Sequence, residues 1–221
     1  MPAMTSQLAS LKKLQGHSRE HLFKALYETS HPGCVVEVIY GRRKPDVCIK
    51  RNGVVIHNIS VKSADKVIQW ELKSKSKLFA IYGDNHLITE FMNIRTQNDK
   101  PTQKQLFVDY FPKIIAYFAN VDNFKHFITK HFTNNHEVDL LAVGNGTSYN
   151  IYNFQKVLDY MANNYVVKTS EQQIQINTTD DYLMFSIEIR SDKKCMLIRQ
   201  DVTSLNRILK HITPVDIVPP V

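Results

Sequence analysis

The sequence of 221 residues predicts an α/β protein in which helices flank a mixed central β-sheet. Segments with helical periodicity alternate along the chain with short runs of β-branched residues, the order that favours a mixed α/β architecture. Apolar residues make up 43% and charged residues 22%, which are ordinary values for a globular chain. This length can bury one substantial core, so we expect a single domain over residues 1–221.

The N-terminal part of the chain predicts a helix followed by three strands. Ser18 can cap a helix over residues 19–29, because its hydroxyl can accept a hydrogen bond from a first-turn backbone N–H that has no partner within the helix. β-branched content predicts strands at 35–40, 46–50 and 54–62. Asn52-Gly53 lies between the last two runs, and Asn-Gly in that position is a strong hairpin signal. Residues 46–62 are therefore expected to form an antiparallel hairpin.

The rest of the chain alternates between helical and strand patterns. A helix is expected to begin at Asp84, and two amphipathic helical segments, 102–111 and 122–132, are expected to separate near Pro112. A buried strand at 138–143 precedes a helix capped by Asn153. The β-rich end predicts strands at 173–177, 182–190 and 195–199, and the proline-rich tail 213–221 is expected to be extended.

Charge and cysteine content narrow the function classes. The net charge of +7 and the pI of about 9.2 favour a polyanionic partner. No apolar run approaches the roughly 20 residues that span a bilayer, and the first residues lack a secretory apolar stretch, so we expect a cytoplasmic protein with no membrane partner. The three cysteines are an odd number without C-x-x-C spacing, which indicates neither a disulfide framework nor a cysteine zinc site.

Asp46, Ser60 and Lys62 form the pattern that carries chemistry. Residues two apart in a strand share a face, so Ser60 and Lys62 point to the same side. A strict two-residue turn at Asn52-Gly53 would pair Asp46 with Ile59 and place it on the opposite face. We therefore predict an extra residue or a β-bulge near the turn or near Pro45, which restores Asp46 to a position opposite Ser60.

These residue types fit phosphodiester hydrolysis assisted by Mg²⁺. A carboxylate such as Asp46 can hold the cation through oxygen, and a lysine such as Lys62 can orient the attacking water and stabilise the anionic transition state. Mg²⁺ keeps several waters, so one or two protein carboxylates are enough. We expect Glu20 to supply the second carboxylate and the backbone carbonyl of Val61 to be a further ligand.

The segments "KPDVCIK" and "IHNISVK" resemble the PD-(D/E)xK nuclease superfamily, and look closest to the HinP/MspI group of type II restriction endonucleases, which cut four-base-pair sites. In that group the usual acid two residues before the lysine is Gln or Asn, and here it is Ser60. "GHSRE" is also similar and carries the family's helical acid onto Glu20. The resemblance covers residues 16–98 and implies a restriction-endonuclease-like core, double-stranded DNA as substrate, and a DNA methyltransferase as functional partner.

Basic side chains and one glutamine, after the second hairpin strand and near the C-terminus, are candidate DNA contacts. They are Lys66, Gln69, Lys73, Lys75 and Lys77, and in a second patch Arg190, Lys193, Lys194 and Arg199. Glutamine can read an adenine edge and lysine a guanine edge, whereas the other basic side chains would contact phosphates. A solvated charged face is the alternative for each of them. DNA-binding helices and strands are expected within residues 99–212.

Two other functions are compatible with this pattern. The first is a repair or structure-specific nuclease of the same superfamily. The second is a non-catalytic DNA-binding module that keeps the fold without a full metal site. The nine histidines do not favour a zinc or His-Asn-His nuclease, because paired cysteines and ββα spacing are absent from the sequence. The active species can be a monomer or a homodimer.

Overall fold

The computed structural model describes residues 18–40, 45–64, 67–97, 99–170, 173–190 and 195–220. The chain divides into two compact units, the first of residues 1–65, 133–157 and 212–221, and the second of residues 66–132 and 158–211. Each unit holds one β-sheet, so the α/β prediction is confirmed but the expectation of one central sheet is wrong. The C-terminal strands pair with β4 (Ile68–Ser74) and build a sheet of their own. The single endonuclease domain stays a prediction.

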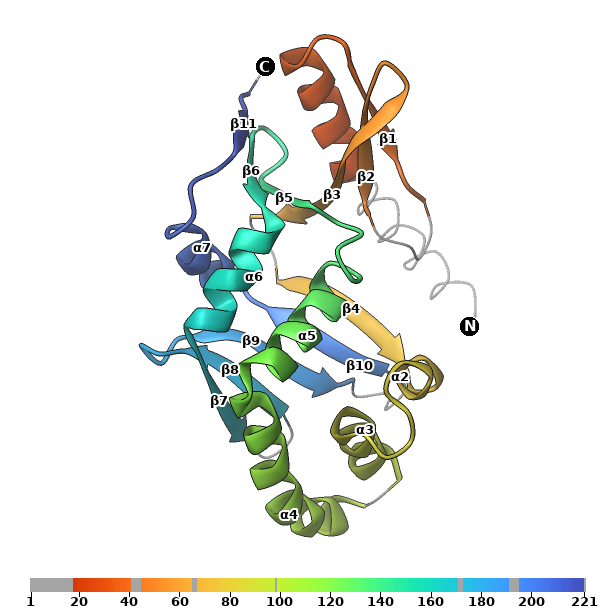
Figure 1. Cartoon of the computed structure of the whole chain (residues 1–221), viewed down its shortest axis with the longest axis vertical. Helices are drawn as coiled ribbons and strands as arrows, with labels where there is room; N and C mark the ends of the chain where they lie inside the picture. Colours follow the sequence, from red (N-terminus) through yellow and green to blue (C-terminus); the bar gives the residue numbers. More distant parts are fainter. Residues whose placement is uncertain are drawn as a thin grey trace, which may run out of the picture. The chain divides into compact units, whose positions relative to one another are not determined.

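The first unit contains a six-stranded mixed sheet in the order β1-β2-β3-β5-β6-β11 (Figure 1). Only β3 and β5 pair in parallel among these neighbours, and the other pairs are antiparallel. The last strand lies in the tail that was expected to be extended, and it pairs with β6. The strands are β1 Cys34–Val38, β2 Val47–Arg51, β3 Val54–Ser63, β5 Leu140–Gly144, β6 Tyr149–Asn153 and β11 Asp216–Val218.

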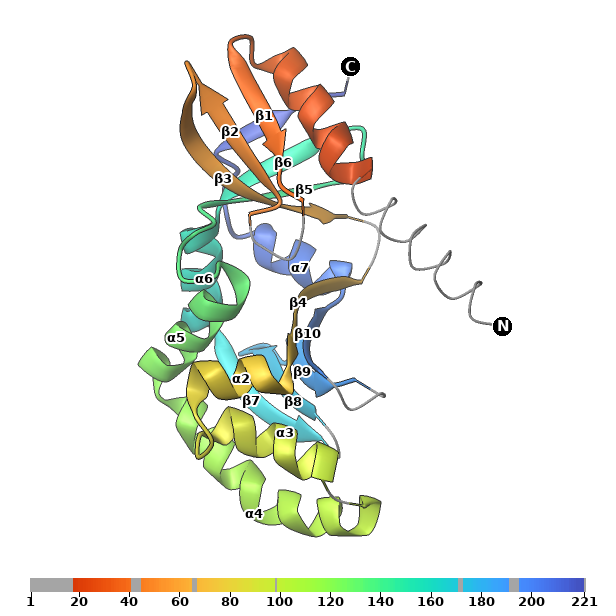
Figure 2. The ribbon, with the colours of Figure 1, turned by 90° about the vertical axis from the view of Figure 1, so that its right-hand side faces the viewer.

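The helix of residues 18–30 packs on one face of this sheet (Figure 2). Phe23 and Tyr27, four residues apart, point from the helix into a core that includes Ile49 and Ile59. Fully burying an aliphatic or aromatic side chain of this size contributes about 1.5–3 kcal/mol. Because side chains alternate along a strand, burying Ile59 on this face directs Ser60 to the other one.

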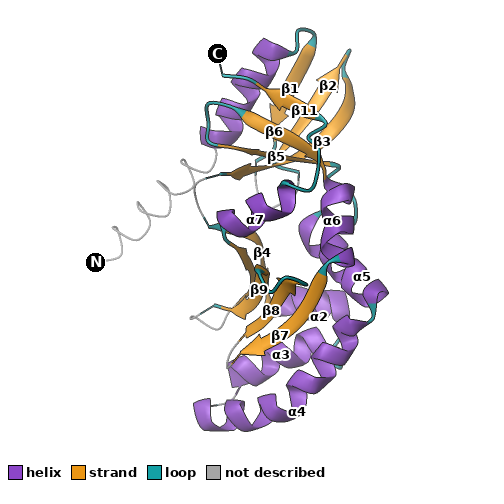
Figure 3. Cartoon of the chain, turned by 90° about the vertical axis from the view of Figure 1, so that its left-hand side faces the viewer, coloured by secondary structure: helices purple, strands orange, loops and turns teal. Residues whose placement is uncertain are grey.

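The second unit contains a five-stranded antiparallel sheet in the order β4-β10-β9-β8-β7. The helices α4 and α5 contact β7 and β4 respectively, and Figure 3 shows both along the sheet. Phe185 of β9 packs against Phe124 and Phe132 of α5. The elements are β7 Tyr165–Ser170, β8 Gln173–Thr178, β9 Leu183–Ile189, β10 Cys195–Gln200, α2 Lys75–Tyr82, α3 Leu87–Gln97, α4 Lys100–Ala119, α5 Val121–Phe132 and α7 Val202–Leu209; α6 Phe154–Asn163 crosses the unit boundary.

Helix α4 corrects the prediction of a break near Pro112. The helix runs through this proline and ends at Ala119. Pro112 is solvent exposed, whereas Tyr110, Ile114 and Phe118 form a buried stripe on both sides of it. Packing of that stripe outweighs the roughly 3 kcal/mol that a proline costs inside a helix. The predicted helix at Asp84 begins at Leu87, and β4, α2, β6, β7 and α7 were not anticipated.

The described helices include none that is both long and apolar enough to cross a bilayer. The longest of them, α4, carries three lysines and an aspartate along its length.

Candidate active site

The hairpin of β2 and β3 has the irregularity that the sequence predicts. Arg51 pairs with Val54 around Asn52-Gly53, whose φ angles of 52° and 79° are both positive, as a type I′ turn requires. The register then shifts between Ile49 and Lys50. Beyond this β-bulge Val47 pairs with Ile59, so the next pair outward brings Asp46 opposite Ser60. The predicted bulge is confirmed.

Asp46 is the centre of a compact hydrogen-bonded cluster at this end of the sheet. Its Oδ2 accepts hydrogen bonds from Ser60 Oγ at 2.8 Å, from the Val61 backbone N–H at 2.8 Å and from Lys62 Nζ at 3.0 Å. Ser60 is fully buried, and the side chains of Asp46 and Lys62 are 21% and 15% exposed. The expected grouping of these side chains on one face is confirmed. Ser60 contributes a hydroxyl donor to the carboxylate.

The Asp46 carboxyl is held in its charged form. Burial by itself would raise its pKa, but the Lys62 charge and the hydrogen bonds from Ser60, Lys62 and Val61 outweigh that effect, so the pKa lies below the ordinary aspartate value. All three donors converge on Oδ2, and within the described residues no donor is directed at Oδ1. As far as the described residues go, Oδ1 is left for another positive group.

The Val61 carbonyl is directed toward the same edge of β3 as the Asp46 carboxylate. The N–H and C=O of one strand residue point to the same neighbouring strand. The Val61 N–H points to Asp46, and the Ile59 carbonyl accepts from the Asp46 N–H at 3.0 Å, whereas the Asn58 carbonyl accepts from Asp139 N on the β5 side. In this part of β3 the backbone N–H and C=O groups of odd-numbered residues, Val61 included, thus point toward β2. A carboxylate oxygen and a backbone carbonyl on one edge are ligand types that Mg²⁺ takes.

The described residues include no group of three or more His, Cys, Asp or Glu side chains placed to hold a metal ion. A cation that keeps most of its water ligands needs only one or two protein ligands, such as a carboxylate and a backbone carbonyl.

Glu20 lies in the first described turn of the helix of residues 18–30 and is half buried. It precedes Phe23 and Tyr27 by three and seven residues, so it shares their side of the helix. That helix packs on the Ile59 face of the sheet, opposite to the face that carries Asp46. Glu20 would therefore have to reach around the end of the sheet, and its role as the second carboxylate stays a prediction.

The candidate DNA contacts fall into different environments in the second unit. Gln69 and Arg199 are exposed and directly opposite each other on β4 and β10. Lys73 pairs with Met196 on the other face of this sheet and is only 9% exposed, so it is not displayed as a surface contact. Lys75 lies 5.4 Å from the centre of the Phe79 ring, Lys77 and Arg190 are at or near the surface, and Lys66, Lys193 and Lys194 lie outside the described residues.

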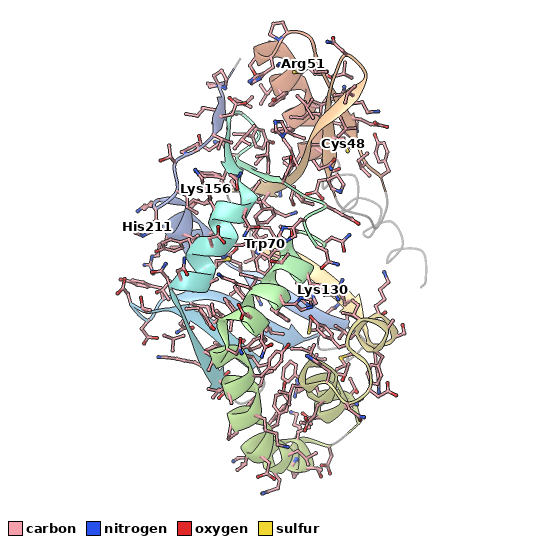
Figure 4. The ribbon with its side chains drawn as sticks, viewed as in Figure 1. Cys48, Arg51, Trp70, Lys130, Lys156 and His211 are labelled. Carbon is pink, nitrogen blue, oxygen red and sulfur yellow. The ribbon has the colours of Figure 1, made fainter. Side chains whose placement is uncertain are left out.

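A second set of polar contacts on the first sheet was not anticipated. Asp139 accepts from the Asn58 N–H at 2.7 Å and contacts His57 Nδ1 at 3.1 Å. Cys48, labelled in Figure 4, donates to Asn58 Oδ1 at 3.0 Å. The Asp139 contacts tie β3 to the segment that enters β5, and the Cys48 contact ties β2 to β3. Only the parallel pairing of β3 and β5 brings Asp139 to this position, and no local sequence signal announces that pairing.

Comparisons with protein-family models, with curated proteins and with solved structures found no match to this chain. The resemblance to the PD-(D/E)xK superfamily stays a prediction from the sequence.

Proposed function

We propose that this protein is a Mg²⁺-dependent endonuclease that hydrolyses phosphodiester bonds of double-stranded DNA at specific sites. The observation that carries the proposal is the convergence of Ser60, Val61 and Lys62 on one oxygen of Asp46 across a bulged hairpin. Two strands hold a carboxylate and an ammonium group 3.0 Å apart, and both remain partly open to solvent. A carboxylate that can hold a cation, with an ammonium group beside it, suits phosphate hydrolysis.

Each residue has a definite task in this proposal. Asp46 Oδ1 and the Val61 carbonyl would hold Mg²⁺, which supplies charge neutralisation at the phosphate and acidifies a bound water. Ser60 and the Val61 N–H fix the carboxylate orientation through Oδ2. Lys62 carries three N–H donors, one of which reaches Asp46, and its charge would stabilise the anionic transition state.

Cleavage of plasmid DNA in the presence of Mg²⁺ tests the proposal. Wild-type protein should convert plasmid into discrete fragments, and Asp46→Asn should cut at least about 100-fold more slowly, the scale of losing one charge-stabilising group. Glu37→Gln is the matched control, because Glu37 is an exposed carboxylate of β1 on the same sheet face. Equal cutting by Asp46→Asn and wild type would refute the assignment of Asp46.

The pattern of products separates the proposal from its alternatives. Discrete fragments from plain duplex indicate site-specific cutting, which also implies a methyltransferase that protects the host DNA. Cutting restricted to branched or damaged duplexes would identify a structure-specific nuclease instead. A non-catalytic DNA-binding module is favoured by one observation, the neutral Ser60 at the position where the superfamily usually has an acid. That module would bind DNA and leave plasmids of varied sequence intact.

A further inference from the structure

A row of polar side chains crosses the five-stranded sheet of the second unit. Arg199 of β10 lies directly between Gln69 of β4 and Ser186 of β9. Gln175 of β8 lies opposite Ser186, and Lys168 of β7 lies opposite Gln175. Directly opposite residues have Cβ atoms about 4.5–5.5 Å apart, so neighbouring side chains of the row are within reach of one ligand.

The row lies on the face of this sheet opposite to the Phe185 side. The residues flanking the row in sequence, such as Ile176, Ile187 and Ile198, are fully buried and point to the opposite face. Trp70, labelled in Figure 4, also points there and donates to Gln200 Oε1 at 2.7 Å. The aromatic contacts of Phe185 with α5 fill that apolar side.

Only the β4–β10 end of the row presents side chains that are both exposed and unoccupied. Gln69 and Arg199 are exposed, and neither makes a side-chain hydrogen bond or ion pair with any described residue. Ser186 is 3% exposed and donates to Glu188 Oε1 at 2.5 Å. Lys168, at the other end, is already paired with Asp181 at 2.6 Å. A guanidinium beside an amide, both without a partner in the described part of the chain, is therefore the accessible feature.

We infer that Gln69 and Arg199 form a base-reading pair that contacts two neighbouring base pairs of double-stranded DNA in the major groove. The inference rests on the proposed function and names the residues that set its specificity. Arginine binds guanine O6 and N7 through two hydrogen bonds, and glutamine binds adenine N6 and N7 in the same way. The net charge of +7 makes a polyanion the complementary partner.

The placement of the pair suits duplex DNA. The major groove admits a two-stranded β-ribbon, and β4 is the edge strand of its sheet, with β10 beside it. The spacing of about 5 Å between the two Cβ atoms compares with about 3.4 Å between successive bases, a difference that long side chains can span. A register shift between Ile198 and Arg199 aligns Arg199 with Gln69, because Ile198 pairs with Glu71 and the next residue, Arg199, pairs with Gln69.

Selection from a pool of randomised duplexes tests the inference. All variants carry Asp46→Asn so that bound DNA stays intact, and bound duplexes are recovered and sequenced. The parent protein should enrich a defined site. Arg199→Ala should lower the preference for guanine at one position by roughly 10- to 100-fold, the scale of one bidentate contact, and Gln69→Ala should do the same for adenine at a neighbouring position. Lys168→Ala is the control from the same row and should keep the enriched site unchanged.

Arg199→Lys distinguishes base reading from phosphate binding. It keeps the charge but loses the planar fork of two parallel donors, so the salt dependence of binding should persist while the guanine preference falls less than in Arg199→Ala, because lysine can also bind guanine. Unchanged selectivity in Arg199→Ala and Gln69→Ala would overturn the inference. Cleavage by protein with intact Asp46 is scored separately. If the Arg199 variant cuts DNA with an unchanged base preference, the base-reading role of Gln69 and Arg199 is refuted and the nuclease proposal stands. If the protein binds selectively but never cuts, the nuclease proposal is refuted and the base-reading role stands.

Discussion

Replacing Lys62 with methionine removes the charge that faces Asp46 while keeping most of the side-chain volume. The Asp46 and Lys62 side chains are 21% and 15% exposed, so the pair is largely shielded from water. Leaving a buried ion without its partner costs about 3–5 kcal/mol, and losing one charged hydrogen bond costs about 1.5–3 kcal/mol. Asp46 keeps Ser60 and the Val61 N–H as donors. We therefore expect Lys62→Met to lower the free energy of unfolding by about 2 kcal/mol at pH 7.

The pH dependence follows from the lowered pKa of Asp46. A carboxyl with a depressed folded-state pKa stabilises the fold fully above its unfolded pKa of about 3.9, and this contribution is lost as the pH falls through the folded value. Urea unfolding should therefore show the full difference between wild type and Lys62→Met at pH 7 and a progressively smaller one as the pH falls below about 3.9 toward the folded-state value. The difference shrinks because a protonated Asp46 no longer needs the ammonium group.

A double-mutant cycle isolates the interaction. Asp46→Asn with Lys62→Met should lose less stability than the sum of the single variants, with a coupling energy of about 1.5–3 kcal/mol at pH 7. A coupling energy below about 0.5 kcal/mol, unchanged between pH 7 and pH 3, would refute the pairing of the two side chains.

Three further changes test the surrounding fold. Glu28 Oε1 accepts a hydrogen bond at 2.8 Å from the Val36 N–H on the edge strand β1, and Glu28→Ala should expose this N–H. We expect a loss of about 1–2 kcal/mol in the free energy of unfolding by urea, and concentration-dependent association in sedimentation. Glu37→Ala should cause neither effect. Gly53→Ala should cost about 1 kcal/mol through backbone strain at φ 79°, because nothing lies within 4 Å of the added methyl group, and Gly53→Asn should recover part of that loss. Asn153→Ala should cost about 1 kcal/mol, since Asn153 Oδ1 accepts the Lys156 N–H at the start of α6; an unchanged melting temperature would argue against the cap.

Local patterns were sufficient where one strand directly follows another. Asn52-Gly53 predicts the turn. If Asp46 and Lys62 act together they must share a face, and a two-residue turn allows this only with a bulge, so the sequence predicts both the hairpin and its bulge. The helix of residues 18–30 and the Asn153 cap are likewise local features. Helix α4 shows the limit of such rules, because the break expected at Pro112 is overridden by packing of a buried stripe on either side of it.

What the sequence by itself determined is the hairpin with its shared face of Asp46, Ser60 and Lys62, because turn geometry and the two-residue period of a strand act between near neighbours. Only the tertiary structure decided that the late strands form a second sheet and that Arg199 lies opposite Gln69. It also decided that Glu20 sits on a helix covering the opposite face from Asp46. Pairings across such separations depend on how whole apolar faces pack, which no local pattern encodes.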